Sequence, residues 1–180
     1  MESPIREALL VSLTDAMRAK GSWCGETHLQ KATYFLQEMT AVPTGFDYIL
    51  FHHGPFSFDL REELTAMRAN GFLTLQVKAP PYGPSFLTTQ AGEQLQAMMK
   101  DETSAYGNNL RFTADWLGVM KAADLERVAT AFYVMKDKPD FSKDDQAAEV
   151  NRLKPHITSE SALEAIAEVE RKRAEWSAAA

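Results

Sequence analysis

The sequence predicts a mainly α-helical protein with a small antiparallel β-hairpin or three-stranded sheet. Apolar residues recur every three or four positions through most of the chain, which is the spacing of helices that bury one face. Residues 72–88 differ, because apolar residues there alternate in two short runs around a proline-rich segment. With 180 residues, 45% of them hydrophobic, the chain is long enough to bury a core.

The first two helices carry recognisable end signals. Ser3 and Pro4 resemble an N-cap followed by proline at the first helical position, and Gly21 is expected to end the first helix. A second helix is expected over roughly residues 26–39, and Pro43 lies beyond its end.

A short strand and a third helix follow. The run 46–51 is apolar and rich in strand-forming residues, so we expect a strand there. The segment 52–57 is expected to turn, with Ser57 capping a helix that Asn70 and Gly71 end.

Residues 73–77 and 85–88 predict two strands joined by a loop at 80–84, and Thr88 or Thr89 is expected to cap the next helix. Three helices, a strand, a loop, a strand and a helix are the order of a winged helix. We therefore expect a winged-helix-like unit at 1–102, in which the strand at 46–51 joins the hairpin as a third strand.

The rest of the chain predicts a helical extension, residues 103–180, that packs on the first part. A helix is expected around residues 104–120, and Asp124 is expected to cap another that ends at Pro139. Further helices are expected to begin at the capping box of Ser142 with Asp145 and near Ser161. We expect the two parts to share one core.

Charge and cysteine content bear on the class of protein. The net charge is −6, divided as −2 over residues 1–100 and −4 over residues 101–180, so neither half has the basic excess of a nucleic-acid surface. Cys24 is the sole cysteine, which excludes an internal disulfide. No apolar run approaches the length of a membrane span, and the N-terminus lacks signal-peptide features. A cytoplasmic protein that contacts no membrane is expected.

Histidines and Cys24 raise the question of a metal or catalytic site. His52 and His53 are adjacent in an expected strand, so their side chains point to opposite faces. Cys24 and His28 lack an orienting third group, and the chain has no nucleophile elbow or phosphate loop. We therefore expect no metal, no cofactor, no catalytic residues and no enzymatic activity.

The third helix offers an argument for DNA binding. Arg61, Thr65 and Arg68 form one stripe at the position of a recognition helix, and the wing adds Lys78 and Tyr82. Because residues 58–69 carry a net charge of −1, few cations are available for phosphates. DNA binding is thus the alternative to protein binding, and a small-molecule hydrolase is a third class.

A partner is expected to bind where the second helix meets the turn after the short strand. Lys31 and Tyr34 share a helix face distinct from the inward stripe at Leu29, Ala32 and Leu36. The turn adds an aromatic side chain on a rigid Gly-Pro backbone. The alternative is that Tyr34 and Phe56 fill the core. The expected surface consists of Lys31, Tyr34, His53, Gly54, Pro55, Phe56 and Ser57.

Several motifs, in this order and spacing, resemble the YwgA-like proteins and the related Panacea domain of SocA-type antitoxins. They are Leu29-Gln-Lys31-x-x-Tyr34-Phe-Leu36, His53-Gly-Pro-Phe-Ser57-x-x-Leu60, Leu64 through Gly71-Phe-Leu73, Asp124-Leu-Glu-x-x-Ala129-Thr-Ala-x-Tyr133 and Leu153-Lys-Pro155. The resemblance implies a protein-binding role, antitoxin-like or phage-associated, with a toxin as one candidate partner. It supplies no catalytic residues. A homodimer remains open.

Overall fold

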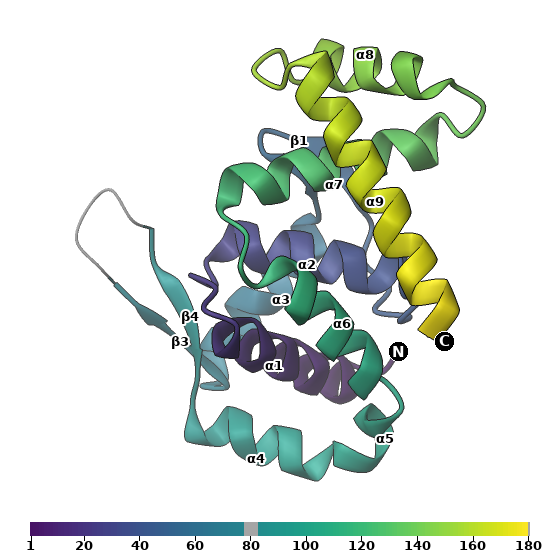
Figure 1. Ribbon diagram of the computed structural model, residues 1–180. Coiled ribbons are helices and arrows are strands. Elements are labelled where there is room, and N and C mark those ends of the chain that lie inside the picture. Colours follow the sequence, from purple (N-terminus) through teal and green to yellow (C-terminus); the bar gives the residue numbers. More distant parts are fainter. Residues whose placement is uncertain (78–82, 180) are drawn as a thin grey trace. The chain divides into compact units, whose positions relative to one another are not determined.

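A computed structural model describes residues 1–77 and 83–179 (Figure 1). The described chain is mainly helical with two small antiparallel sheets of two strands each, which confirms the predicted fold class. It divides into two compact units. Unit 1 comprises Met1–Tyr48 and Ser57–Lys121, and unit 2 comprises Ile49–Phe56 and the chain from Ala122 onward. The division expected at 102/103 instead falls inside a helix of unit 1.

Unit 1 contains six helices in its described residues, and their end signals are largely those expected. Ser57 Oγ accepts a hydrogen bond from Leu60 N at 3.2 Å, and Thr89 Oγ1 accepts one from Gly92 N at 3.2 Å. Gly21 ends the first helix with a φ of +88°. The helices are α1 (Ser3–Ala19), α2 (Glu26–Glu38), α3 (Phe58–Ala69), α4 (Gln90–Met98), α5 (Lys100–Ser104) and α6 (Gly107–Leu117).

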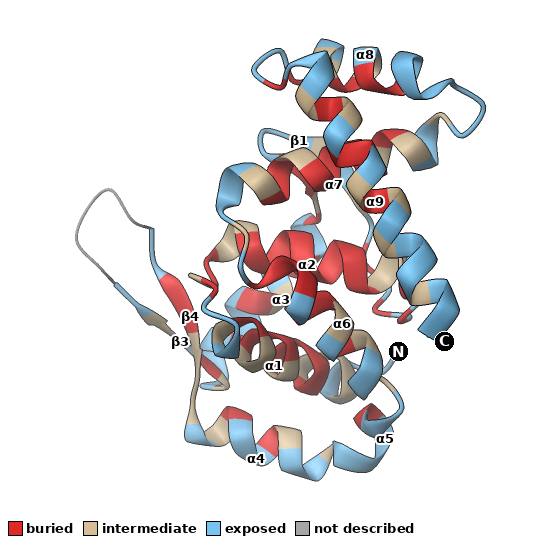
Figure 2. Cartoon of the chain, viewed as in Figure 1, coloured by how far each residue is buried: buried red, intermediate tan, exposed pale blue. Residues whose placement is uncertain are grey.

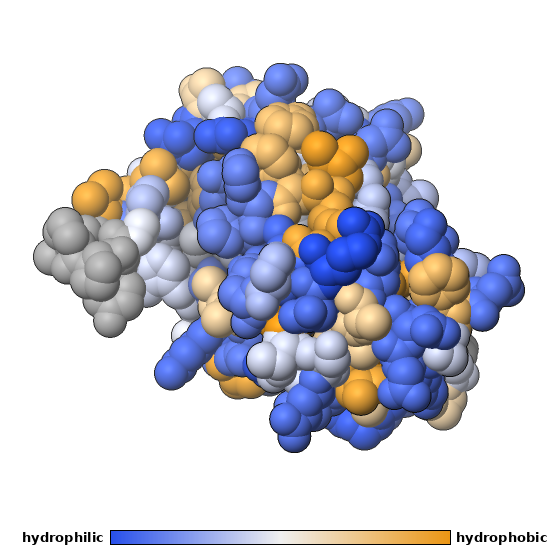
Figure 3. Space-filling view, turned by 90° about the horizontal axis from the view of Figure 1, so that it is seen from above, coloured by the Kyte–Doolittle hydropathy of each residue, from blue (hydrophilic) through white to orange (hydrophobic). Residues whose placement is uncertain are grey.

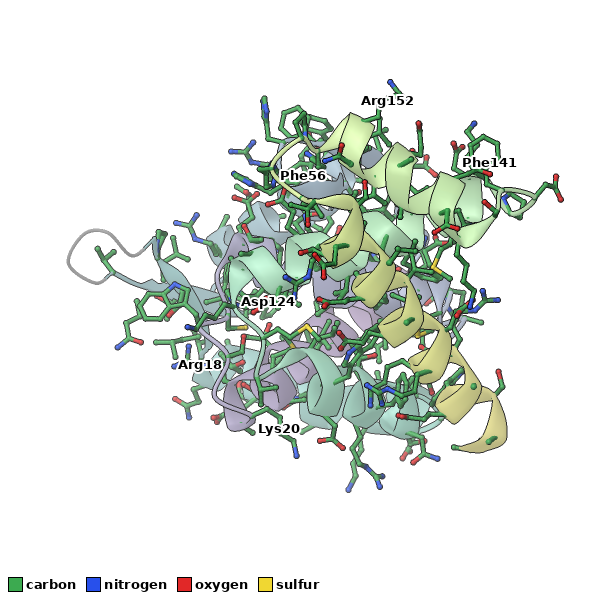
Figure 4. The ribbon with its side chains drawn as sticks, turned by 45° about the horizontal axis from the view of Figure 1, so that its top comes forward. Arg18, Lys20, Phe56, Asp124, Phe141 and Arg152 are labelled. Carbon is green, nitrogen blue, oxygen red and sulfur yellow. The ribbon has the colours of Figure 1, made fainter. Side chains whose placement is uncertain are left out.

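The hairpin expected at residues 72–88 is present in unit 1. Strand β3 (Leu73–Gln76) pairs antiparallel with β4 (Ser85–Thr88). On its other side β4 meets the segment between α1 and α2, because Phe86 N donates to Cys24 O at 2.9 Å. Arg18, labelled in Figure 4, donates from Nη1 to Phe86 O at 3.1 Å, which ties the hairpin to α1.

The expected three-stranded sheet is wrong. Strand β1 (Ile49–Phe51) pairs with β2 (Gly54–Phe56), a strand that the sequence did not predict, and not with the β3–β4 hairpin. Only His52 and His53 separate β1 from β2, so this pairing closes a far shorter loop than pairing with β3 or β4 would. Gly54 supplies the left-handed residue that the tight turn needs, with a φ of +87°.

Helix α2 is buried on every side. Each residue from His28 to Leu36 is buried, and Figure 2 shows nearly all of the helix in red. The Gln30 amide compensates for its burial by two hydrogen bonds of 2.9 Å, donating to Ser57 O and accepting from Ser57 N. The polar residues of this helix therefore do not mark a solvent-facing side.

Unit 2 consists of the β1–β2 hairpin and three helices in the described residues. Helix α7 (Ala122–Asp137) contacts α8 (Lys143–Leu153), α9 (Ser159–Ala179) and β2. Ser142 and Asp145 cap α8 as expected. Asp124 was expected to cap α7 but lies inside its first turn and pairs with Arg127 at 3.0 Å. The core of the unit is formed by Leu125, Val128, Ala129, Phe132, Val150, Ala162, Ile166 and Val169.

Across the parts of the chain that the structure describes, no helix combines the length and the apolar character needed to span a bilayer.

Candidate functional site

Several residues of the expected binding surface are buried, which contradicts part of that expectation. Lys31 and Tyr34, both in unit 1, are only 1% and 3% exposed, so the expectation that they face solvent is wrong. Gly54 and Pro55 are buried in unit 2, and Ser57 is buried as the cap of α3. His53 is exposed and Phe56 is partly so. A surface built on α2 is ruled out, while the turn at His52 and His53 in unit 2 is exposed.

Cys24 and His28 lie in unit 1 and are both buried. Burial raises the pKa of the Cys24 thiol to about 12, so the thiol stays protonated near neutral pH. Burial lowers the pKa of His28, against a hydrogen bond to the Met120 backbone that acts the other way. A protonated thiol in the core is a poor nucleophile.

In unit 2 the β1–β2 hairpin is held by a buried lysine. Lys154 follows the last residue of α8, and its side chain is 9% exposed. Its Nζ donates to the backbone oxygens of Phe51 and His52, each at 2.5 Å. Because these two carbonyls belong to the end of β1 and the start of the turn, the lysine fixes the tip of the hairpin.

The carboxylate of Glu126, on α7, lies among three nitrogen-bearing side chains of the same unit. Its Oε2 is 3.5 Å from His53 Nδ1, and its Oε1 is 3.2 Å from His156 Nε2 and 3.8 Å from Lys154 Nζ. Oε1 is buried and accepts no hydrogen bond of good geometry within the described residues. Burial of a carboxylate is tolerated where a cation lies near it, here the ammonium group of Lys154.

The two histidines are exposed to solvent, whereas the glutamate between them is buried. The Glu126 side chain is 10% exposed, whereas those of His53 and His156 are 72% and 62% exposed. A carboxylate that contacts one imidazole nitrogen fixes the ring and leaves the other nitrogen for a partner. Among the described residues, no group of three or more His, Cys, Asp or Glu side chains is arranged to hold a metal ion.

Apolar side chains stand exposed on the same hairpin. Ile49 is 49% exposed and Phe51 is 39% exposed, and the Phe51 ring lies 4.4 Å from that of His52 and 5.5 Å from that of Phe56, centroid to centroid. Figure 3 shows apolar side chains gathered among hydrophilic ones on the face seen from above. We call the side chains of Ile49, Phe51, His52, His53 and His156 the hairpin surface.

Three of the residues expected to contact DNA, Arg61, Thr65 and Arg68, are described and lie in unit 1. Arg61 Nε is 3.4 Å from Glu26 Oε1, so its charge is partly satisfied. A groove of about 460 Å³ is lined by Thr65, Arg68, Ala69, Leu73, Thr74 and Leu75, which places a flank of α3 beside β3. Lys78 and Tyr82 lie outside the described residues.

Sequence reasoning identified His53 but missed the residues that surround it. Glu126, Lys154 and His156 are 73 or more positions away in the chain, and only the first two were noted in the sequence, as members of the family motifs. One signal was available in the sequence: Lys154 directly precedes Pro155, which breaks the helix. A lysine that is merely exposed does not need this fixed place at a helix end. A single sequence does not show that such distant residues meet.

No model of a known protein family matches this sequence, and no curated protein matches it. The family resemblance of the motifs therefore stays a prediction.

Proposed function

We propose that this protein is a non-enzymatic, cytoplasmic protein-binding module, an antitoxin-like or phage-associated regulator that acts through the hairpin surface. The observation that carries the proposal is the exposure of Ile49 and Phe51 on a hairpin whose tip is fixed by Lys154. Exposed apolar and aromatic side chains on a rigid backbone bind a partner with little loss of conformational entropy.

The strand edge adds a second contribution to binding. Within the described residues β1 pairs with β2 alone, and β2 contacts α7. The edge of β1 away from β2 therefore pairs with no other strand of the described chain, and a partner segment could add a strand there. The three-residue length of β1 limits this contribution, so the side chains carry most of the expected affinity.

Comparative capture from a lysate of the host cell tests the proposal. The baits are the wild-type protein, the double variant Ile49→Ser/Phe51→Ser and the control Phe141→Ser. Phe141 is also an exposed aromatic residue of unit 2, at 45%, and Figure 4 shows it well away from Phe56 of the hairpin. Partners are identified by mass spectrometry.

We expect the wild type and the control to retain one partner that the double variant loses by about tenfold or more, since truncation of hot-spot side chains removes at least about 1.4 kcal/mol. If the partner is a toxin, co-expression with the wild type restores growth and co-expression with the double variant does not. Equal capture by all three baits, or the absence of a partner, contradicts the proposal.

DNA binding is a second candidate because of the groove between α3 and β3. Arg68 reaches this groove and makes no ion pair within the described chain. Against it, Asp59 and Glu62 are exposed on the same helix, and Arg61 lies near Glu26. The local charge thus disfavours phosphate contacts, as the overall charge does.

Fluorescence anisotropy with duplex DNA tests this candidate. A DNA-binding protein shows an affinity that falls steeply between 50 and 200 mM salt, and Arg68→Ala lowers the salt slope by about one unit. We expect no binding even at 50 mM salt. Salt-dependent binding that Arg68→Ala weakens would replace protein binding as the proposed function.

A further inference from the structure

We infer that the hairpin surface binds an acidic segment of its partner, one that also carries an apolar side chain, and binds it more tightly as the pH falls. The inference rests on the proposed function and specifies the chemistry of the partner.

The charges of the surface carry this inference. The titratable groups that it exposes are imidazoles, those of His52, His53 and His156. The carboxylate that His53 and His156 contact, Glu126, is buried on α7, and Lys154 lies beside it. The surface therefore presents groups that can become positive and hides the negative group beneath them. Its electrostatic complement is an anion.

The geometry of the histidines explains the dependence on protons. Nδ1 of His53 and Nε2 of His156 face Glu126, so the opposite nitrogen of each ring is turned away from that carboxylate. A neutral imidazole has a single N–H, and a carboxylate neighbour attracts it. Protonation adds a second N–H on the outward nitrogen, which can then donate to an anion of the partner. Anion binding and proton binding consequently strengthen each other.

The apolar part of the surface excludes a purely ionic ligand. Ile49 and Phe51 are two positions apart on β1 and both are exposed, so they lie on the same face of the strand. An extended segment with an apolar residue between acidic ones would place the apolar side chain on Ile49 and Phe51 and its carboxylates near the imidazoles. A free inorganic anion lacks the first of these contacts.

Two fluorescent synthetic peptides of ten residues test the inference by anisotropy. One has four acidic residues around a central Leu-x-Trp, and the matched control has lysine at each acidic position. Both are titrated with the 180-residue protein at pH 6.0 and pH 7.5 at constant ionic strength. The protein variants are Ile49→Ser/Phe51→Ser, His52→Gln/His53→Gln/His156→Gln and the control Phe141→Ser.

We expect the acidic peptide to bind about tenfold more tightly than the lysine peptide at pH 6.0, and several-fold more weakly at pH 7.5 than at pH 6.0. The triple histidine variant should abolish this pH dependence, Ile49→Ser/Phe51→Ser should abolish binding, and Phe141→Ser should change neither. Equal binding of the two peptides, no binding, or pH dependence that survives loss of all three histidines overturns the inference. If the captured partner depends on the hairpin but the acidic peptide does not compete with it, the proposed function stands and this inference fails.

Discussion

Replacement of Lys154 by methionine is expected to lower the free energy of unfolding by about 3 kcal/mol, the value typical of breaking a buried pair. Methionine retains the apolar stem but cannot donate to the carbonyls of Phe51 and His52. It also leaves the buried carboxylate of Glu126 without its nearby ammonium group. Equilibrium urea denaturation measures the effect.

A matched pair of variants separates burial from charge. Lys143 makes an exposed ion pair with Glu170 at 2.6 Å, so Lys143→Met should cost less than about 1 kcal/mol. In the double variant Lys154→Met/Glu126→Leu no buried carboxylate remains, and about half of the lost stability should return. If Lys154→Met is no more destabilising than Lys143→Met, Lys154 does not hold the hairpin.

Replacement of Gly92 by alanine is expected to destabilise the protein by about 2–3 kcal/mol, as overpacking does. A Cβ atom at this position would lie 2.4 Å from the backbone oxygen of Phe72 and 3.0 Å from a methyl group of Thr88. The first contact is with backbone, which cannot rotate away. The Phe72 oxygen also accepts a hydrogen bond from Thr89 N at 3.1 Å, so retreat would disturb the start of α4.

Gly107 provides the control for this substitution. It is the first residue of α6, and a Cβ there would meet no atom within 4 Å. Gly107→Ala should leave stability unchanged or raise it by up to about 1 kcal/mol, because alanine restricts the unfolded chain. Thermal denaturation of both variants compares the two sites. Equal melting temperatures would contradict the close approach of α4 to Phe72.

Local signals predicted the helix ends because each acts over a few residues. Ser57, Thr89 and Ser142 cap helices as expected, and Gly71 ends α3 with a φ of +77°. Partner choice between strands was not predictable in the same way. Gly54 and Pro55 are typical of a turn, yet they form β2 because the two-residue loop brings them directly opposite β1.

The candidate site was predicted only in part for a related reason. Lys31 and Tyr34 looked solvent-facing because polar residues usually mark the outer face of a helix, whereas α2 is buried all round. His53 belongs to the site, but Glu126 and Lys154 reach it from α7 and from the end of α8. Contacts over such separations depend on the tertiary fold, which helix and strand periodicity does not encode.

Site-directed photocross-linking in host cells tests the central claim most directly. Phe51 is replaced by the photoreactive analogue p-benzoylphenylalanine, and the same analogue at Phe141 serves as the control, since both positions are exposed aromatics of unit 2. We expect irradiation to yield one discrete cross-linked protein from position 51 and none from position 141. A cross-link from position 141 alone, or from neither position, would contradict binding through the hairpin surface.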